Sequence, residues 1–391
     1  MSVIATITGA ALTRFDHRRD GSSFRDWAGD AFEAALAMSG LDRDEIGALV
    51  VASESDFFTF QLNPATVIAG DLGLTGVSAL RVEGGGASGQ LAVHAGARIV
   101  ATGQARHVAV VGVDPSASTL PGSTVKMLYG MSFDQWSDGM TGTTSTALYA
   151  LSVQSFLART GIGVWALDAV TMANRANACA NPGAHLPRRH GAAEIASSPM
   201  IAAPYRRLHC SPLSDGAAAL ILSYPGAVPE ARRGAAGIVG TGAATDKFHL
   251  GARADLGRFA AKTLAMQRAC AIAAITPSDV GLAEVYDAYA GAQLQALEAL
   301  GLSEQIGADL EAGRFAPSGA LPVNLSGGLL GQGAPVGATG VGQTATCALA
   351  LEGRYHAGLQ PRELPRYALA DTHGGVCTTA AVTLLQAGAE A

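Results

Sequence analysis

Residues 86–104 read GASGQLAVHAGARIVATGQ, and residues 337–354 read GATGVGQTATCALALEGR. Both stretches open with a turn of small residues and continue with the apolar spacing of a helix. A strand follows the first at HVAVVGVD, and another follows the second, after an insertion, at GGVCTTAAVTLL. The two stretches are therefore interpreted as two copies of one unit, and this repeat decides the predicted fold.

A second pair of segments repeats in the same order. AALAMSGLDRDEIGALVV at 34–51 and ACAIAAITPSDVGLAEVY at 269–286 both run from a helix of small residues, through a turn, to a strand. Chance similarity is the alternative, because Ala and Gly match easily. We predict an α/β protein of two halves, residues 1–234 and 235–391, with a loop excursion at about 115–205 in the first half.

Composition excludes several classes of protein. The 391 residues suit two domains, and the sequence is 49% hydrophobic and only 15% charged, with 49 glycines. The net charge is −6 and no Lys/Arg run occurs, so we expect neither a nucleic-acid nor a membrane partner. The 5 cysteines are far apart without metal-ligand spacing, so we expect no metal. The N-terminus resembles a first strand rather than a signal peptide, which favours a cytoplasmic protein.

The glycine turn GGGASG at 84–89 allows two functional interpretations. It fits the G-x-G-x-x-G pattern of dinucleotide binding, and Asp114 ends the next strand as a ribose-binding acid would. The spacing to Asp114 is longer than the usual ~20 residues, however, and the second copy lacks the pattern. The other interpretation is a nucleophile elbow, with Gly86 or Ser88 at a helix N-terminus that stabilises an anion. Ser88 has no evident base, so helix capping is its simpler role.

Several segments together resemble the thiolase superfamily, specifically the sterol carrier protein X-type (lipid-transfer) thiolases. VNLSGGLLGQGAPVGATGVGQ at 323–343 is similar to the family's Asn-x-Ser-Gly-Gly stretch and its Gly-His-Pro-x-Gly-Ala-Thr-Gly. EVYDAYAGAQLQALEALGL at 284–302 is similar to its His-Asp helix start, and residues 139–161 and 210–222 match further segments. The resemblance implies a duplicated five-layer αβαβα fold with a loop-domain insertion, and a dimer.

The departures from the family pattern concern its reactive residues. The family's nucleophilic cysteine falls on Gly86, the histidine of Gly-His-Pro falls on Ala334, and the histidine of His-Asp falls on Tyr286. Near the C-terminus, the family's Cys-x-Gly-Gly falls on 372–375. Acyl transfer through a cysteine thioester is therefore excluded unless another residue substitutes.

Retro-aldol cleavage of a β-hydroxyacyl-CoA requires only an oxyanion pocket and a base, without an acyl carrier. The resemblance extends to steroid side-chain aldolases in which a tyrosine replaces the histidine of His-Asp, as Tyr286 does before Asp287 here. Those aldolases tend to have a second tyrosine where this chain has Ala334. The candidate catalytic residues are Tyr286, Asp287, His373 and Cys377. The candidate substrate-binding residues are Gly86, Ser88, Tyr289, Ala334 and Gly375, with the amides of Gly86 and Gly375 as an oxyanion site.

Each catalytic candidate also has a simpler interpretation. Tyr286 would contact the substrate hydroxyl as a base or as a hydrogen-bond donor, but a tyrosine pKa of about 10 needs a partner such as His373 or Asp287. His373 is equally explained as a buried, hydrogen-bonded imidazole. Asp287 is explained as a helix cap, and Cys377 as a small buried apolar residue.

The expected ligand is an acyl-CoA, with coenzyme A as part of the substrate and no other cofactor. Gly86 and Ala334 predict a pocket enlarged for a bulky substrate, and the Trp136 region and residues 187–190 are candidates for binding the acyl chain or the CoA phosphates. The alternatives to an aldolase are a catalytically degenerate subunit that scaffolds a partner, and an acyltransferase that uses a substitute residue. We expect a homodimer or heteromer, and the resemblance implies a small OB-fold/zinc-ribbon partner that helps to bind acyl-CoA.

Overall fold

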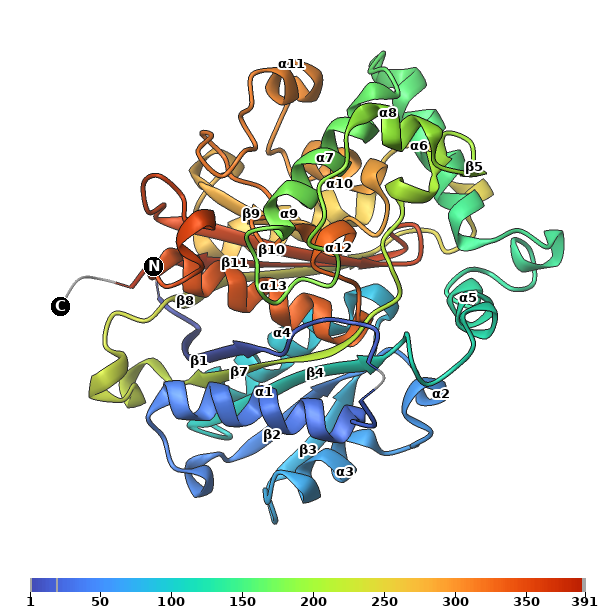
Figure 1. Cartoon of the computed structure of the whole chain (residues 1–391). Coiled ribbons are helices and arrows are strands. Elements are labelled where there is room, and N and C mark those ends of the chain that lie inside the picture. The colour runs from blue at the N-terminus through green and yellow to red at the C-terminus, as the bar shows by residue number, and fades with distance from the viewer. Residues whose placement is uncertain (1, 19, 389–391) are drawn as a thin grey trace.

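The computed structural model describes residues 2–18 and 20–388, which form one continuous nine-stranded sheet of strand order β3-β2-β4-β7-β1-β8-β11-β10-β9 (Figure 1). The strands of this sheet are β1 (Ala5–Leu12), β2 (Ala48–Ala52), β3 (Ser78–Val82), β4 (His107–Pro115), β7 (Asp215–Ser223), β8 (Gly237–Thr245), β9 (Leu282–Glu284), β10 (Tyr367–Gly374) and β11 (Thr379–Gln386). Over the described ranges, no helix is long and apolar enough to cross a membrane.

The two halves of the sheet share one connectivity. In the first half, β2 and β4 are parallel, and β7 runs antiparallel to both β4 and β1. In the second half, β9 and β10 are parallel, and β11 runs antiparallel to both β10 and β8. The halves join where Ala5 of β1 pairs with Ile238 of β8. The strand that would match β3 is reduced to an isolated bridge between Ala283 and Val323. The boundary expected at 234/235 falls between β7 and β8.

Helices cover both faces of each half-sheet, which gives five layers. One outer layer contains α1 (Phe24–Ser39) and α3 (Pro64–Asp71), and the other contains α9 (Ala260–Ala273) and α10 (Ala290–Ala299) (Figure 1). The middle layer is formed by α4 (Ser88–Ala101) and α13 (Val336–Leu351), which pack on each other and on both half-sheets. This is the αβαβα arrangement that the resemblance implies, and the predicted fold class is confirmed.

The repeated motif explains how the middle layer packs. Gly89 ends GASG and Gly340 ends GATG, so these glycines occupy equivalent positions in the two copies. A β-carbon on Gly89 would lie 2.6 Å from the backbone nitrogen of Gly340, and one on Gly340 would lie 2.5 Å from the nitrogen of Gln90. Only glycine permits this close approach of two helix backbones. The stretch that predicts the duplication is therefore the contact between its two copies.

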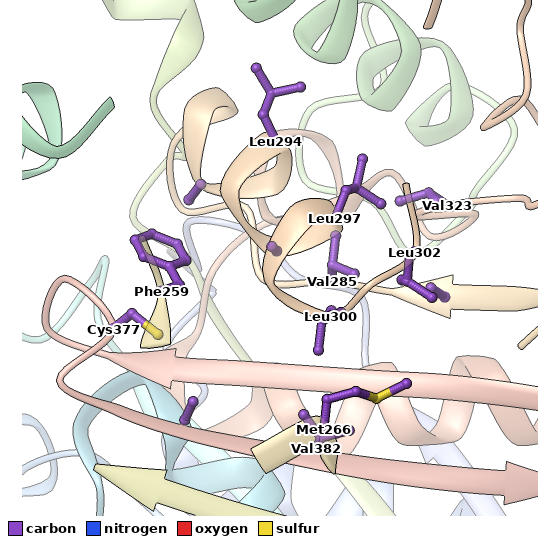
Figure 2. Close-up of a cluster of buried hydrophobic side chains, with 14 of the residues drawn as sticks. Phe259, Met266, Val285, Leu294, Leu297, Leu300, Leu302, Val323, Cys377 and Val382 are labelled. Carbon is purple, nitrogen blue, oxygen red and sulfur yellow. The ribbon is translucent and has the colours of Figure 1, made fainter. Parts of the chain in front are cut away.

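The excursion expected at about 115–205 lies between β4 and β7 and packs against α10 and α12. Its elements are α5 (Gly122–Gly130), α6 (Ser145–Thr160), α7 (Trp165–Ala178), α8 (Ala192–Ser197), β5 (Met200–Ala202) and β6 (Tyr205–Arg206). The remaining short helices are α2 (Asp56–Thr59), α11 (Ile306–Glu311) and α12 (Gly328–Gly331). Figure 2 shows part of the apolar core of the second half, in which Met266 and Val382 lie below Leu300.

Candidate functional site

The turn between β3 and α4 is stabilised by Ser88. Its hydroxyl donates to the carbonyl of Gly85 at 2.6 Å and accepts from the nitrogen of Gly84 at 3.0 Å. Ser88 is fully buried, and the residue at the N-cap position of α4 is Ala87. Ser88 therefore does not cap α4 by its side chain, which corrects that expected role, and its hydroxyl is engaged within the turn. Gly86 belongs to the 3-10 turn Gly85–Ala87 directly before α4, and the first backbone N–H groups of a helix have no intrahelical acceptor.

Gly86 has no room for a side chain. A β-carbon there would lie 2.2 Å from the carbonyl oxygen of His373 and 2.7 Å from the hydroxyl oxygen of Tyr286. A cysteine at this position would therefore require Tyr286 to move. The space that the family's nucleophile would occupy is filled by the tyrosine. The expectation that Gly86 enlarges the pocket is wrong for this reason.

Tyr286 follows β9 and places its ring against the glycine turn. The ring packs edge-on against His373, with centroids 4.7 Å apart, and contacts Leu329 and Ala334. Its hydroxyl makes no hydrogen bond with any other described residue. Burial raises the pKa of Tyr286, and the nearby carboxylate of Glu54 raises it further. Tyr286 is therefore a neutral hydrogen-bond donor at pH 7 rather than a base.

Ala334 lies beside the tyrosine, as the alignment of motifs predicts. Its nitrogen donates to the hydroxyl of Ser214 at 3.0 Å, and its methyl group packs with Leu329. A buried alanine offers no group for proton transfer. The small side chain of Ala334 leaves room for the ring of Tyr286 to extend to the glycine turn between β3 and α4.

His373 belongs to a buried hydrogen-bonded chain. The Lys262 ammonium, which forms an ion pair with Asp371, donates to His373 Nδ1 at 3.1 Å. Because an ammonium group only donates, Nδ1 accepts, and the imidazole proton is assigned to Nε2. Nε2 lies 2.9 Å from the hydroxyl of Tyr149, which in turn donates to the carbonyl of Gly375. Both imidazole nitrogens of His373 and the hydroxyl of Tyr149 are thus engaged by other protein groups.

This arrangement leaves His373 without a free lone pair. Burial lowers the pKa of His373 well below its ordinary value, and the charges of Lys262 and Arg253 lower it further. The imidazole is therefore neutral and fully engaged, and it cannot accept a substrate proton. The simpler interpretation, a buried hydrogen-bonded imidazole, is the one that the geometry favours.

Asp287 caps a helix, although not the helix that it precedes in sequence. Its carboxylate accepts from the nitrogens of Leu329 and Leu330 at 2.6 and 3.3 Å, at the start of α12. It also accepts from Asn174 Nδ2 at 2.7 Å. Burial raises the pKa of Asp287 to about 7. Asp287 therefore joins α12 to the excursion and is not a partner of the Tyr286 hydroxyl.

Cys377 is fully buried and lies close to Phe259 in the apolar core (Figure 2). Burial raises the pKa of its thiol to about 12. A buried neutral thiol is not a nucleophile, so the apolar role is the one that the geometry supports.

Tyr289 and Gly375 contribute to the wall behind the site. The hydroxyl of Tyr289 forms a hydrogen bond with Thr146 at 3.0 Å, and its ring lies against Tyr149 with centroids 4.5 Å apart. The Gly375 carbonyl is occupied by Tyr149. Tyr289 therefore has its polar group in use, whereas Tyr286 does not.

Acidic side chains that were not predicted as site residues lie at the carboxyl edge of β2 and β4. Asp114 accepts from Ser53 Oγ at 3.0 Å and from the nitrogens of Glu54 and Gly337 at 3.1 and 2.5 Å. This carboxylate ties β2 and β4 to the start of α13, which does not support its expected role with a ribose. Glu54 Oε2 is buried without a partner. An acid directly after the apolar strand ALVVA is the sequence signal that could have indicated Glu54.

Metal chemistry has no support in this part of the chain. Among residues 2–18 and 20–388, no group of three or more His, Cys, Asp or Glu side chains could hold a metal ion.

Comparisons with known proteins show the family and the fold of the chain. Residues 3–186 match the family described as "Thiolase, N-terminal domain", and residues 242–387 match "Thiolase C-terminal domain-like". The chain is 32% identical to acetyl-CoA acetyltransferase from Methanothermobacter thermautotrophicus over 96% of this chain and 97% of that one. It is 25% identical to sterol carrier protein 2 of Oryctolagus cuniculus over 98% of this chain and 72% of that one. The solved Ltp2-ChsH2(DUF35) aldolase covers all of this chain with a TM-score of 0.84 at 24% identity.

Proposed function

The chain belongs to the thiolase superfamily, and we propose that it cleaves a β-hydroxyacyl-CoA by a retro-aldol reaction without a covalent intermediate. One observation carries this proposal. The hydroxyl of Tyr286, which has no hydrogen-bond partner among the described residues, lies 2.7 Å from the position that the β-carbon of a nucleophile at residue 86 would take. The family scaffold is kept, and a hydrogen-bond donor takes the place of the acyl carrier.

The cysteines of the chain do not replace the missing nucleophile. Cys270, Cys347 and Cys377 are buried, and neither Cys179 nor Cys210 belongs to the glycine turn. A hydroxyl nucleophile is also unsupported, because Ser88 is buried in the turn itself. Activity of the acetyltransferase type, as the name of the 32% identical relative would suggest, therefore lacks its covalent step here.

In the retro-aldol reaction the electron pair of the β-O–H bond forms the new carbonyl, and the pair of the carbon–carbon bond passes into the enolate. The β-hydroxyl loses its proton, the bond between the α- and β-carbons breaks, and its electrons pass into the thioester as an enolate. The α-carbon then takes up a proton, which gives an acyl-CoA and an aldehyde or ketone. No oxidant or cofactor is consumed, because the coenzyme A of the substrate remains in the acyl-CoA product.

Two groups of this chain stabilise the developing charges. The first amides of the helical turn, including that of Gly86, donate to the enolate oxygen, where the α4 helix dipole favours negative charge. The Tyr286 hydroxyl donates to the oxygen that becomes the carbonyl of the leaving aldehyde or ketone. Each donor of this kind contributes about 10²–10³ in kcat.

The surroundings suggest how an acyl chain or a partner would approach. Trp136 and Met140 on the excursion are 88% and 77% exposed, and they follow α5. The name of the Ltp2-ChsH2 structure gives that aldolase with a second protein. We therefore propose that the chain forms a homodimer or a heteromer, and that an OB-fold/zinc-ribbon protein is an additional partner. The excursion would then line one side of the route by which acyl-CoA enters.

A scaffolding subunit is the second candidate function. It is favoured by the replacement of three reactive positions, at Gly86, Tyr286 and Ala334. The two functions are distinguished by incubating the protein, alone and with a candidate partner, with β-hydroxyacyl-CoAs. Release of an aldehyde or ketone supports the aldolase. No release, together with tight co-purification of a thiolase that has its cysteine, supports the scaffold and contradicts the aldolase.

A further inference from the structure

Glu54 lies beside the glycine turn and has no structural role for its carboxylate. Glu54 follows β2. The strands β3 and β4 are parallel to β2 and end at the same edge of the sheet. Its Oε1 would lie 3.9 Å from a β-carbon on Gly85, the residue next to Gly86. Its backbone nitrogen is held by Asp114, whereas its Oε2 is buried without a hydrogen-bond partner.

The unpaired oxygen is not isolated. Tyr129 lies near it: the charge of Glu54 raises the pKa of Tyr129, whose hydroxyl also interacts with that of Ser116. The charge of Glu54 raises the pKa of Tyr286 as well. Buried polar atoms are almost always satisfied, so the unpartnered Glu54 Oε2 indicates a polar ligand or an ordered water beside it.

The other acid–base groups near the turn are engaged. His373 uses both nitrogens, between Lys262 and Tyr149. Asp287 accepts from the start of α12, and Asp114 accepts three hydrogen bonds. Among the buried acid–base side chains that the structure describes near the turn, Glu54 is therefore the one left to take up a proton from a ligand.

The charges around Glu54 make its carboxylate more basic than usual. Burial raises the pKa of Glu54 well above its ordinary value, and the carboxylates of Asp114 and Glu83 raise it further. Arg81 of β3 is the nearby cation, but it forms an ion pair with Asp56. A carboxylate whose pKa is raised is, once ionised, a stronger base than an ordinary carboxylate.

We infer that Glu54 is the base of this site: its carboxylate takes the β-hydroxyl proton as the carbon–carbon bond breaks, and returns that proton to the α-carbon of the enolate. This assignment rests on the proposed retro-aldol function. The proton leaves one substrate oxygen and ends on the substrate's own α-carbon, so Glu54 is regenerated in each turnover. Tyr286 remains neutral throughout and donates only a hydrogen bond.

The first test is Glu54→Gln, which keeps the shape and removes the basicity. We expect the cleavage rate to fall at least about 100-fold. The rise of kcat/KM with pH on the acidic side, which reports ionisation of Glu54, should disappear from the residual rate. The matched control is Glu83→Gln, which removes the same charge from an exposed position of the same turn and should change the rate less than about twofold. A Glu54→Gln enzyme with wild-type rate and pH profile would overturn the inference.

A second readout separates this inference from the proposed function. Acetyl-CoA in D₂O should exchange its α-protons for deuterium in the wild-type protein, because the same base removes the proton that it delivers during cleavage. If the wild type exchanges without cleaving any β-hydroxyacyl-CoA, and Glu54→Gln abolishes exchange, Glu54 is supported and the retro-aldol function is rejected. If the wild type neither cleaves nor exchanges, both are rejected.

A variant that misfolds would not be informative, so the folded state must be checked independently. Glu54→Ala should have the same circular dichroism spectrum as the wild type and should regain part of its exchange activity when formate is added. Formate supplies a carboxylate to the vacated space. Failure of formate to restore any activity in a folded Glu54→Ala protein, together with an active Glu54→Gln protein, contradicts a role in proton transfer.

Discussion

A β-carbon on Gly86 would lie 2.7 Å from the hydroxyl oxygen of Tyr286, so a side chain at position 86 and the tyrosine hydroxyl cannot both occupy this space. The tyrosine in this position therefore requires a glycine at position 86, where the family has its nucleophile. The carbonyl of His373, at 2.2 Å from the same β-carbon, closes the remaining space. The turn holds a hydrogen-bond donor where the family would place a thiolate.

Restoring the family's residue at the turn should not restore the family's chemistry. Gly86→Cys and Gly86→Ala both place a β-carbon against backbone and against Tyr286, and such overpacking costs about 1–3 kcal/mol of stability. We expect a lower Tm, loss of cleavage and no acyl-enzyme by mass spectrometry after incubation with acetyl-CoA. A stable Gly86→Cys protein that becomes acylated would show that Tyr286 moves aside readily.

Tyr286→Phe should separate catalysis from stability. The hydroxyl has no hydrogen bond to a described residue, so its removal should leave Tm within a few degrees of the wild-type value. The cleavage rate should fall about 10²-fold or more, because one donor to the developing charge is lost. Tyr289→Phe is the control, since the Tyr289 hydroxyl is already bound to Thr146 and its loss should cost less than about tenfold. Equal rates in wild type and Tyr286→Phe would remove Tyr286 from the mechanism.

The buried ion pair of Lys262 and Asp371 should be essential for folding. Both side chains are fully buried, and Lys262→Met would leave an unpaired carboxylate and an unbound His373 nitrogen. We expect a loss of about 3–5 kcal/mol in the free energy of unfolding, measured with urea. The exposed pair of Arg188 and Glu194 provides the comparison, for which Arg188→Met should cost less than about 1 kcal/mol. Similar costs for the two variants would contradict the assigned role of Lys262.

The pH dependence of stability should report the burial of Asp287. Its pKa is about 7 in the folded protein and 3.8 in its ordinary state, so between these values the folded protein holds a proton that the unfolded chain releases. The stabilising contribution is complete below about pH 4 and is lost as the pH rises through 7. The destabilisation caused by Asp287→Asn should therefore be larger at pH 5 than at pH 8.

Asp26 is the control for that measurement, because its pKa is lowered in the folded protein whereas that of Asp287 is raised. Hydrogen bonds from Ser23 lower the pKa of Asp26, so it is ionised in both states throughout this range. The cost of Asp26→Asn should be the same at pH 5 and pH 8. A larger cost of Asp287→Asn at pH 8 than at pH 5 would show that Asp287 is ionised in the folded protein.

The sequence predicts the fold well because its signal is a physical contact. GASG and GATG repeat because Gly89 and Gly340 must lie against each other, and that requirement is visible as two matching short stretches. Tyr286, Ala334 and Gly86 could likewise be brought together by matching each to a family motif. The prediction of an enlarged pocket failed because motif matching gives the identity of a residue and not the direction of the tyrosine ring.

The polar partners of the site could not be predicted in the same way. Lys262 and Tyr149 reach His373 from helices α9 and α6, which are distant in sequence from β10. No local pattern marks a lysine on a helix of small residues as buried, because its burial depends on Asp371 in another element. Asp287 similarly looks like the cap of the helix that follows it, whereas it binds the start of α12.

The central claim is that this thiolase-fold protein breaks a carbon–carbon bond without a covalent intermediate. Purified protein, alone and with an OB-fold/zinc-ribbon partner, is incubated with β-hydroxyacyl-CoAs, and both products are quantified. The account predicts equimolar release of an acyl-CoA and an aldehyde or ketone, with the intact protein mass unchanged during turnover. Release of free coenzyme A with a covalently acylated protein, or no carbonyl product under any of these conditions, would contradict it.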